Sequence, residues 1–143
     1  MPLRLIDSSV WIAFLRRHPD ARIVRAVRRA LSAGEAAVAA PIVVEVLSGI
    51  RDPEEYSARE DDFRALREVA VDGAAAYLAA RIGEALARAG EAGKTVDLLL
   101  AGAAIQAGAE LWSLADEHFS AIRTVIGRGR VSVPSPFRLL FLP

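Results

Sequence analysis

The 143-residue chain contains no cysteine, which excludes disulfide bonds, thiolate zinc sites and cysteine nucleophiles. It carries no net charge, since 18 basic residues balance 18 acidic ones, so no global field indicates a nucleic-acid binder. Any site for a polyanion must therefore come from local clustering. Long hydrophobic runs are also lacking: the longest, residues 98–109, includes Gln106 and is too short to cross a bilayer. Lysine is nearly absent, because every basic residue except Lys94 is arginine.

No secretion signal is expected at the start of the sequence. The apolar stretch after Met1 is interrupted by Asp7 and closed by Arg16 and Arg17, without a small-residue cleavage site. We therefore expect a cytoplasmic protein that makes no membrane contact, folded as a single domain over residues 1–143. The apolar fraction of 53% and the mean hydropathy of +0.28 are high for this length and favour a buried partner surface.

Strand-like and helix-like patterns alternate along the chain. Strands are expected at residues 3–6, 36–39, 69–72, 110–115 and 130–133, and helices at 10–15, 19–33, 41–49, 54–68, 74–89, 98–107 and 117–126. The apolar tail, residues 137–142, is expected to dock on the core or on a partner. This alternation predicts an α/β domain with a mostly parallel central sheet covered on both faces.

Four acidic residues stand out from the solvated ones by their position. Asp7 ends the first strand, Glu45 interrupts an apolar helix, Asp97 begins another, and Asp116 ends a later strand. Taken singly, each has a simple structural explanation: the three aspartates can cap helices, and Glu45 can be a surface residue on a half-buried helix.

Taken together, the four acids predict a different role. Neighbouring parallel strands place Asp7 and Asp116 on the same edge of the sheet, where helices can add Glu45 and Asp97. Clustered carboxylates repel and raise one another's pKa values, a problem that a divalent cation removes. Oxygen ligands without cysteine or a histidine pair suit Mg²⁺ or Mn²⁺ rather than zinc, and such ions take up substrate phosphate.

The sequence resembles a known family in four motifs that occur in order. They are a strand–Asp–Ser–Ser–helix opening, LRLIDSSVWIAFL; a glutamate in an apolar helix, PIVVEVLSG; an aspartate before a small apolar helix, TVDLLLAGAAIQAG; and a strand–Asp with Phe119 three residues on, ELWSLADEHF. Over residues 3–133 the chain is similar to PIN-domain ribonucleases, specifically the VapC-type toxins of bacterial type II toxin–antitoxin pairs. One position departs from the family pattern: Leu114 stands where a small polar residue often precedes the fourth acid.

The resemblance implies a PIN-like three-layer α/β/α fold and a metal-dependent endoribonuclease. Asp7, Glu45, Asp97 and Asp116 would be catalytic and would hold Mg²⁺, with Mn²⁺ as a substitute, while Ser9 would support the site. A metal-activated water would hydrolyse RNA phosphodiester bonds, leaving a 5′-phosphate and a 3′-hydroxyl. No histidine base is required, so His18 and His118 are not expected to be catalytic.

The resemblance also implies protein partners. They are a cognate VapB-type antitoxin, a small DNA-binding protein whose tail covers the acidic groove, and a second copy of the chain in a homodimer. Two dimers would join in a heterotetramer or larger complex with the antitoxin.

Arginines gather in two segments of the sequence. Six lie between positions 16 and 29, opposed only by Asp20: Arg16, Arg17, Arg22, Arg25, Arg28 and Arg29. Arg16, Arg17 and Arg22 are candidate RNA contacts beside the first motif, although a solvated helix face explains the segment equally well. A smaller candidate cluster comprises Arg123, Arg128 and Arg130.

Three other functions compete with the ribonuclease. A haloacid-dehalogenase-like phosphatase needs a second aspartate at the position of Ser9, and a phosphoacceptor receiver domain needs an acidic pair and a late lysine, whereas Lys94 precedes a helix. A catalytically inactive PIN-like module that binds RNA or protein stays open because of Leu114.

Overall fold

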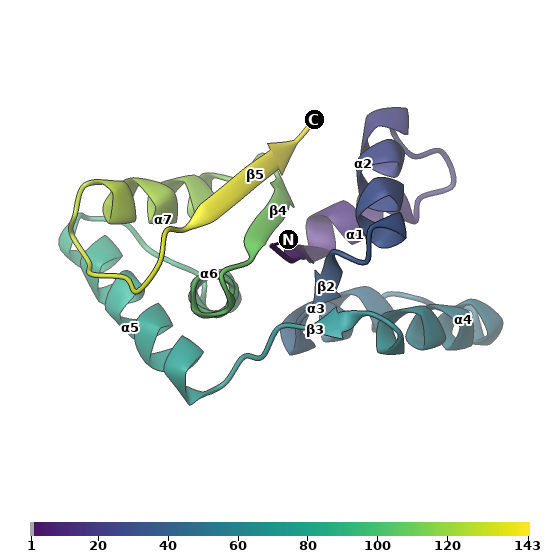
Figure 1. Ribbon diagram of the computed structural model, residues 1–143, viewed down its shortest axis with the longest axis horizontal. Helices are drawn as coiled ribbons and strands as arrows, with labels where there is room; N and C mark the ends of the chain where they lie inside the picture. Colours follow the sequence, from purple (N-terminus) through teal and green to yellow (C-terminus); the bar gives the residue numbers. More distant parts are fainter. Residues whose placement is uncertain (1) are drawn as a thin grey trace.

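The computed structural model describes residues 2–143, which form one sheet of five parallel strands and seven helices (Figure 1). The strands are β1 (Arg4–Ile6), β2 (Ala36–Val38), β3 (Arg67–Glu68), β4 (Glu110–Leu114) and β5 (Arg138–Leu142), in the spatial order β3-β2-β1-β4-β5. The helices are α1 (Ser8–Phe14), α2 (Ala21–Ser32), α3 (Ala40–Leu47), α4 (Pro53–Arg64), α5 (Gly73–Arg88), α6 (Thr95–Ala107) and α7 (Glu117–Gly127). The predicted parallel α/β architecture is confirmed.

Helices cover both faces of the sheet. The chain first moves from β1 to β2 and β3 in one direction, and then returns across the sheet to β4 and β5. Because parallel crossovers are right-handed, this reversal puts α1 to α4 on one face and α5 to α7 on the other. Figure 1 shows the two groups on opposite sides of the strands. The strand order reverses beside β1, and open α/β sheets bind ligands beyond the carboxyl ends of the strands at such a point.

The central strand β1 is short, buried and paired on both sides. Leu5 and Ile6 are fully buried, and Ile6 lies opposite Trp112 of β4. The ladder continues one residue further, because the Asp7 amide donates to the Trp112 carbonyl at 2.9 Å. This hydrogen bond fixes Asp7 at the carboxyl end of β1, beside the end of β4.

Helix α6 is apolar on all sides and is packed into the core, where residues from Leu100 to Ile105 are buried. Its approach to α5 depends on Gly102, since a Cβ there would lie 2.6 Å from the Ala75 carbonyl oxygen. The helix ends at Gly108, whose φ of 64° is in the left-handed region that glycine adopts freely. The first turn of α6 is thereby held at the edge of the sheet where β1 ends.

Two predicted strands are wrong. Residues 69–72 are not a strand: the two-residue β3 precedes them, and only the Val69 amide extends its ladder, to the Val38 carbonyl. Residues 130–133 are not a strand either, because Arg130 closes the turn that ends α7. The last strand is instead the apolar tail: β5 pairs with β4 along its whole length, so the tail docks on the chain's own sheet. Among residues 2–143, no helix has the length and apolarity needed to cross a membrane.

Candidate metal-binding acid site

Asp7 connects β1 to α1 and is almost fully buried, with 7% of its surface exposed. It caps α1, and every hydrogen bond that its side chain accepts goes to Oδ2: from Ser9 Oγ at 2.7 Å, from the Ser9 amide at 3.4 Å and from Ser113 Oγ at 3.4 Å. Within residues 2–143, no group donates to Oδ1. The expected helix cap is therefore real, and it leaves one carboxylate oxygen available to a ligand.

Two serine hydroxyls hold Asp7 in place. Ser9 Oγ donates to Asp7 Oδ2 and accepts the Leu114 amide at 3.3 Å, so it ties the start of α1 to the end of β4. Ser9 therefore lies beside Asp7, and its supporting role stays a prediction. Ser113 is 1% exposed, and its hydroxyl lies 2.9 Å from the Leu114 carbonyl as well as near Asp7.

Glu45 lies in the second half of α3, which packs against α1. Its side chain is exposed to solvent, in keeping with the surface position that the pattern allowed. Partial burial and the negative charge of Asp7 nevertheless raise its pKa, against a hydrogen bond from Ser8 that lowers it. Glu45 is thus an exposed acid within electrostatic reach of the buried one.

Asp97 does not cap its helix, so that explanation is wrong for this residue. The N-cap of α6 is Lys94, which makes no side-chain cap, and Asp97 is the third residue of the helix, half-buried in its first turn. Desolvation, followed by the charges of Asp116 and Asp7, raises the pKa of Asp97 from 3.8 to about 6. His118 and Lys94 lower it in turn. Because the ionised form of Asp97 is disfavoured, a nearby cation would stabilise that form strongly.

Asp116 caps α7, as the simple structural explanation predicted. Its Oδ1 accepts the His118 amide at 2.7 Å and the Phe119 amide at 3.4 Å, while Oδ2 accepts no hydrogen bond within residues 2–143. Asp116 is half-buried, and its charge contributes to the raised pKa of Asp97. Asp116 and Asp7 therefore share one arrangement, in which one oxygen caps a helix and the other remains free.

Electrostatic interactions connect all four acids: Asp7 with Glu45, Asp7 with Asp97, and Asp97 with Asp116. The four carboxylates do not surround a common point: among residues 2–143, no group of three or more His, Cys, Asp or Glu side chains is arranged to hold a metal ion. The donors are all carboxylate oxygens, the ligands that Mg²⁺ and Mn²⁺ prefer. Within residues 2–143, Asp7 Oδ1, Asp116 Oδ2 and both side-chain oxygens of Asp97 accept no hydrogen bond. The chemistry of the donor set therefore fits a hard divalent cation.

Sequence reasoning missed two neighbours of this site. Ser113 carries no local signal, because a serine between Trp112 and Leu114 in an apolar strand has nothing to mark its partner 106 positions away. Although Leu114 supplies no hydroxyl, Ser113 places one near the end of β4. This hydroxyl donates to the Leu114 carbonyl at 2.9 Å and lies 3.4 Å from Asp7 Oδ2. The sequence pattern favours a surface position without a role for His118, yet its ring acts electrostatically on Asp97.

The arginines predicted to contact RNA differ in availability. Arg22 is committed to Asp20 by two side-chain hydrogen bonds, of 3.2 and 2.9 Å, which lower the pKa of the aspartate to about 2. Arg16 and Arg17 lie just beyond the far end of α1 and form no ion pair within the described residues 2–143. Their role stays a prediction.

Comparison with known proteins supplies the family. The PIN domain family matches residues 4–125. The chain is 37% identical to the VapC ribonuclease Mb1587 of Mycobacterium bovis and, equally, to ribonuclease VapC11 of Mycobacterium tuberculosis. Each alignment spans 111 residues and covers 75% of this chain and 82% of the relative.

Solved structures agree on the fold. VapBC2 from Rickettsia felis, bound to a promoter DNA fragment, matches with a TM-score of 0.74 at 16% identity over 99% of both chains. DNA-bound VapBC from Salmonella typhimurium matches with a TM-score of 0.74 at 19% identity, over 99% of this chain and 98% of that chain. At such identities these structures support the three-layer fold alone. With the sequence matches and the acids at the carboxyl ends of β1 and β4, they lead to one conclusion: the chain belongs to the PIN-domain family and, within it, to the VapC type.

Proposed function

We propose that this chain is the toxin of a toxin–antitoxin pair and a Mg²⁺-dependent endoribonuclease. The observation that carries the proposal is the position of Asp7 and Asp116 at the carboxyl ends of the adjacent strands β1 and β4, within electrostatic reach of Asp97. Acids whose charges disfavour one another at the edge of a parallel sheet are characteristic of a site built for a cation and an anionic substrate. The activity named for the VapC relatives is of this kind.

Asp7, Glu45, Asp97 and Asp116 would hold the cation, directly or through water. When bound, Mg²⁺ would lower the pKa of an attacking water and neutralise charge on the scissile phosphate. Ser9 fixes the Asp7 carboxylate through Oδ2, and Ser113 Oγ lies 3.4 Å from the same oxygen, so that Oδ1 is left for a ligand. His118 and Lys94 lower the pKa of Asp97 and so favour its ionised form.

The partners follow from the same family. The matched solved structures are named as VapBC assemblies, and for this chain we propose a VapB-type antitoxin that covers the acid site. We also propose a homodimer and, with the antitoxin, a heterotetramer or larger complex, in keeping with the high apolar fraction of the sequence. Arg16, Arg17 and Arg22 remain the proposed RNA contacts near α1, with Arg22 also paired to Asp20 at the surface.

The test is cleavage of single-stranded RNA by the purified chain with Mg²⁺, with Mn²⁺ and with excess chelator. We expect cleavage only with metal, products that carry a 5′-phosphate, and a loss of at least ~100-fold for Asp7→Asn or Asp97→Asn. Asp61→Asn is the matched control, because Asp61 is an exposed acid on α4 outside the site. Metal-independent cleavage, or full activity in the Asp7 and Asp97 variants, would refute the proposed mechanism. Binding of RNA without any cleavage would instead support the alternative of an inactive module.

A further inference from the structure

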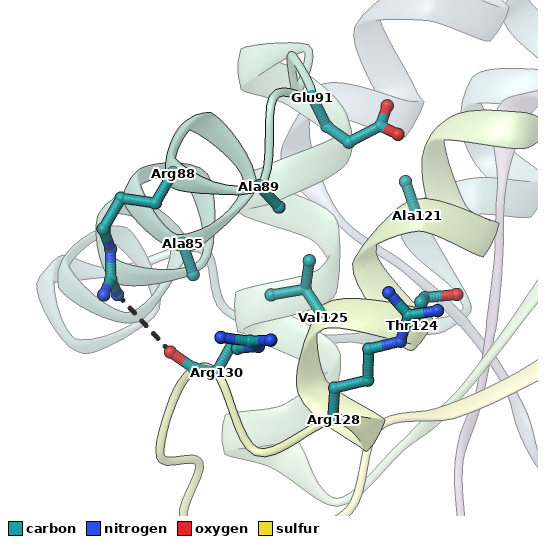
Figure 2. A pocket seen from close by; sticks show the side chains of 9 residues that line it. All are labelled: Ala85, Arg88, Ala89, Glu91, Ala121, Thr124, Val125, Arg128 and Arg130. Atoms are coloured by element: carbon teal, nitrogen blue, oxygen red, sulfur yellow. Dashed lines mark hydrogen bonds between the residues drawn. The ribbon is translucent and has the colours of Figure 1, made fainter.

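A cavity of about 480 Å³ lies between α5 and α7, outside the acid site. We call it the α5–α7 groove; its lining includes Arg88 and Ala89 at the end of α5, Ala121 and Val125 on α7, and Arg128 and Arg130 just beyond α7. Figure 2 shows small apolar side chains on its floor and three arginines around one end, with Glu91 at the other. The volume is in the range of small-molecule sites, so it accommodates a phosphate with its sugar.

A defined turn holds two of the three arginines. Gly129 takes a left-handed φ of 68°, its amide donates to the Ile126 carbonyl at 3.0 Å, and the Arg130 amide donates to the Val125 carbonyl at 3.1 Å. This pair of hydrogen bonds is the Schellman arrangement that ends helices. It fixes the backbone positions of Arg128 and Arg130 on either side of one glycine, at the rim of the groove.

The charges around the groove are not balanced within the chain. Arg88 pairs with Glu84 at 2.8 Å and reaches the Arg130 carbonyl at 3.5 Å, so its role is partly to hold the turn. Within residues 2–143, Arg128 and Arg130 form no ion pair, and Glu91 is the one acid among the lining residues. Two guanidinium groups are thus available for bidentate contact with an anion, the contact that arginine makes with phosphate.

Helix α7 connects this groove to the acid site. Asp116 caps the start of α7 and Arg128 caps its end, so the two are about 18 Å apart along the helix axis, and Ala121 of the groove lies only about 8 Å from the start. A few nucleotides of extended RNA span such a distance. Arg123 does not line the groove; its guanidinium carbon lies 5.4 Å from the centroid of the Phe141 ring.

We propose that the α5–α7 groove binds backbone phosphates of the RNA substrate, a few nucleotides away from the bond that is cleaved, through Arg128 and Arg130. This inference rests on the proposed ribonuclease function and adds a second contact, remote from the acids, to its substrate path. The contact is to phosphate and sugar, so it carries affinity and register but no base specificity.

A purely structural role for the two arginines makes a different prediction. Cations at the end of a helix stabilise it through the helix dipole, so removal of the Arg128 and Arg130 charges would then lower the unfolding temperature and leave RNA binding unchanged. The test must therefore measure stability and binding on the same variants.

The experiment compares wild type, the double variant Arg128→Gln/Arg130→Gln and the control Arg67→Gln, whose exposed arginine lies on the opposite edge strand, β3. Binding of a labelled single-stranded RNA is followed by fluorescence anisotropy over a range of salt concentrations, with chelator present to prevent cleavage. We expect the double variant to bind roughly 10-fold more weakly at moderate salt and to flatten the log–log salt dependence by about 1.4, or about 0.7 for each phosphate that is no longer neutralised. The control variant should match wild type.

A second arm uses cleavage of RNAs of increasing length in Mg²⁺. The double variant should cleave long RNA more slowly than wild type and the shortest cleavable RNA equally fast, since the short RNA does not reach the groove. Unchanged salt dependence overturns the proposal, as does an equal rate reduction at every length, weaker dimer or antitoxin binding with RNA binding intact, or reduced stability alone. If wild type binds RNA through the groove but cleaves none, the ribonuclease proposal is refuted and RNA binding by the groove is supported. If wild type cleaves RNA and the double variant binds RNA normally, the groove proposal is refuted and the ribonuclease proposal is supported.

Discussion

Ser113 Oγ lies 3.4 Å from Asp7 Oδ2, although the two residues are 106 positions apart in the sequence. The contact joins the ends of adjacent strands, because the β1–β4 register places Asp7 and Ser113 one step beyond the pair Ile6 and Trp112. Together with Ser9, it holds the most buried acid of the site by a single oxygen. The other oxygen stays free, so capping a helix and binding a ligand are compatible in one residue.

Ser9→Ala removes the shortest hydrogen bond to that acid. Because the bond links a hydroxyl to a carboxylate in a partly buried position, we expect a loss of about 1–2 kcal/mol in the free energy of unfolding, measured with urea. Mg²⁺ affinity should fall ~10-fold or more, as it does when a group that orients a metal ligand is removed. Ser57→Ala, at an exposed position on α4, is the control and should change neither quantity appreciably. Unchanged metal affinity in Ser9→Ala would show that Ser9 only caps the helix.

Mg²⁺ and Mn²⁺ should stabilise the folded chain. A cation that binds the native state alone, at 100 times its dissociation constant, adds about 2.7 kcal/mol to the free energy of unfolding, which corresponds to a rise of several degrees in the unfolding temperature. We expect this rise in differential scanning fluorimetry and expect chelator to reverse it. Asp7→Asn should abolish the rise and Asp61→Asn should retain it. An equal rise in both variants would place the cation elsewhere.

The metal-free protein should lose stability as the pH rises from about 4 to about 6, through the titration of Asp97. Its folded pKa of about 6 lies above the unfolded value of 3.8, so the folded state holds the proton more tightly and ionisation opposes folding. Asp97→Asn should therefore stabilise the metal-free chain at neutral pH, by about 1–2 kcal/mol once solvent screening of this half-buried group is allowed for. Near pH 4 the variant and the wild type should differ little.

Saturating Mg²⁺ supplies the check on this pH effect. With the cation bound, the ionised Asp97 carboxylate is attracted to it and stabilises the folded chain. Asp97→Asn should therefore become destabilising at neutral pH. Urea unfolding curves with and without metal measure the change in the free energy of unfolding that Asp97→Asn causes in each state. A variant that is less stable than wild type in the absence of metal would mean that helix-dipole stabilisation of Asp97 in the first turn of α6 outweighs the repulsion.

The acids were foreseeable from the sequence because each stands where the local pattern breaks. Asp7 ends an apolar strand, and Glu45 and Asp97 interrupt apolar helices, so hydrophobic periodicity alone isolates them. What the pattern could not supply is how each is held. The N-cap of α6 is Lys94 rather than Asp97, and the hydroxyl nearest Asp7 across the sheet comes from β4. Such contacts depend on strand register, which is a tertiary property.

The edge strands show the same limit. The sequence from Arg138 to Leu142 is compatible with a strand or with an apolar tail that docks elsewhere. It forms β5 because it pairs with the side of β4 that faces away from β1, which the local pattern does not reveal. In contrast, residues 130–133 have strand-like side chains, but Arg130 belongs to the turn at Gly129 that ends α7, and Pro134 and Pro136 follow directly. Similarly, β3 is only two exposed residues long, too short to leave an alternating pattern.

Gly102 sets the approach of α6 to α5 and so the position of Asp97. In Gly102→Ala, the new Cβ would lie 2.6 Å from the Ala75 carbonyl oxygen, a backbone atom that cannot rotate away, so the two helices must separate. We expect a loss of about 1–3 kcal/mol in the free energy of unfolding, as for other overpacked cores, despite the better helix propensity of alanine. Gly73→Ala is the matched control, since Gly73 begins α5 with open space around it and should gain slightly. If Gly102→Ala keeps wild-type stability but binds Mg²⁺ more weakly, the helices have moved apart at little cost and displaced Asp97; if both are unchanged, the close approach is not needed to position the acid.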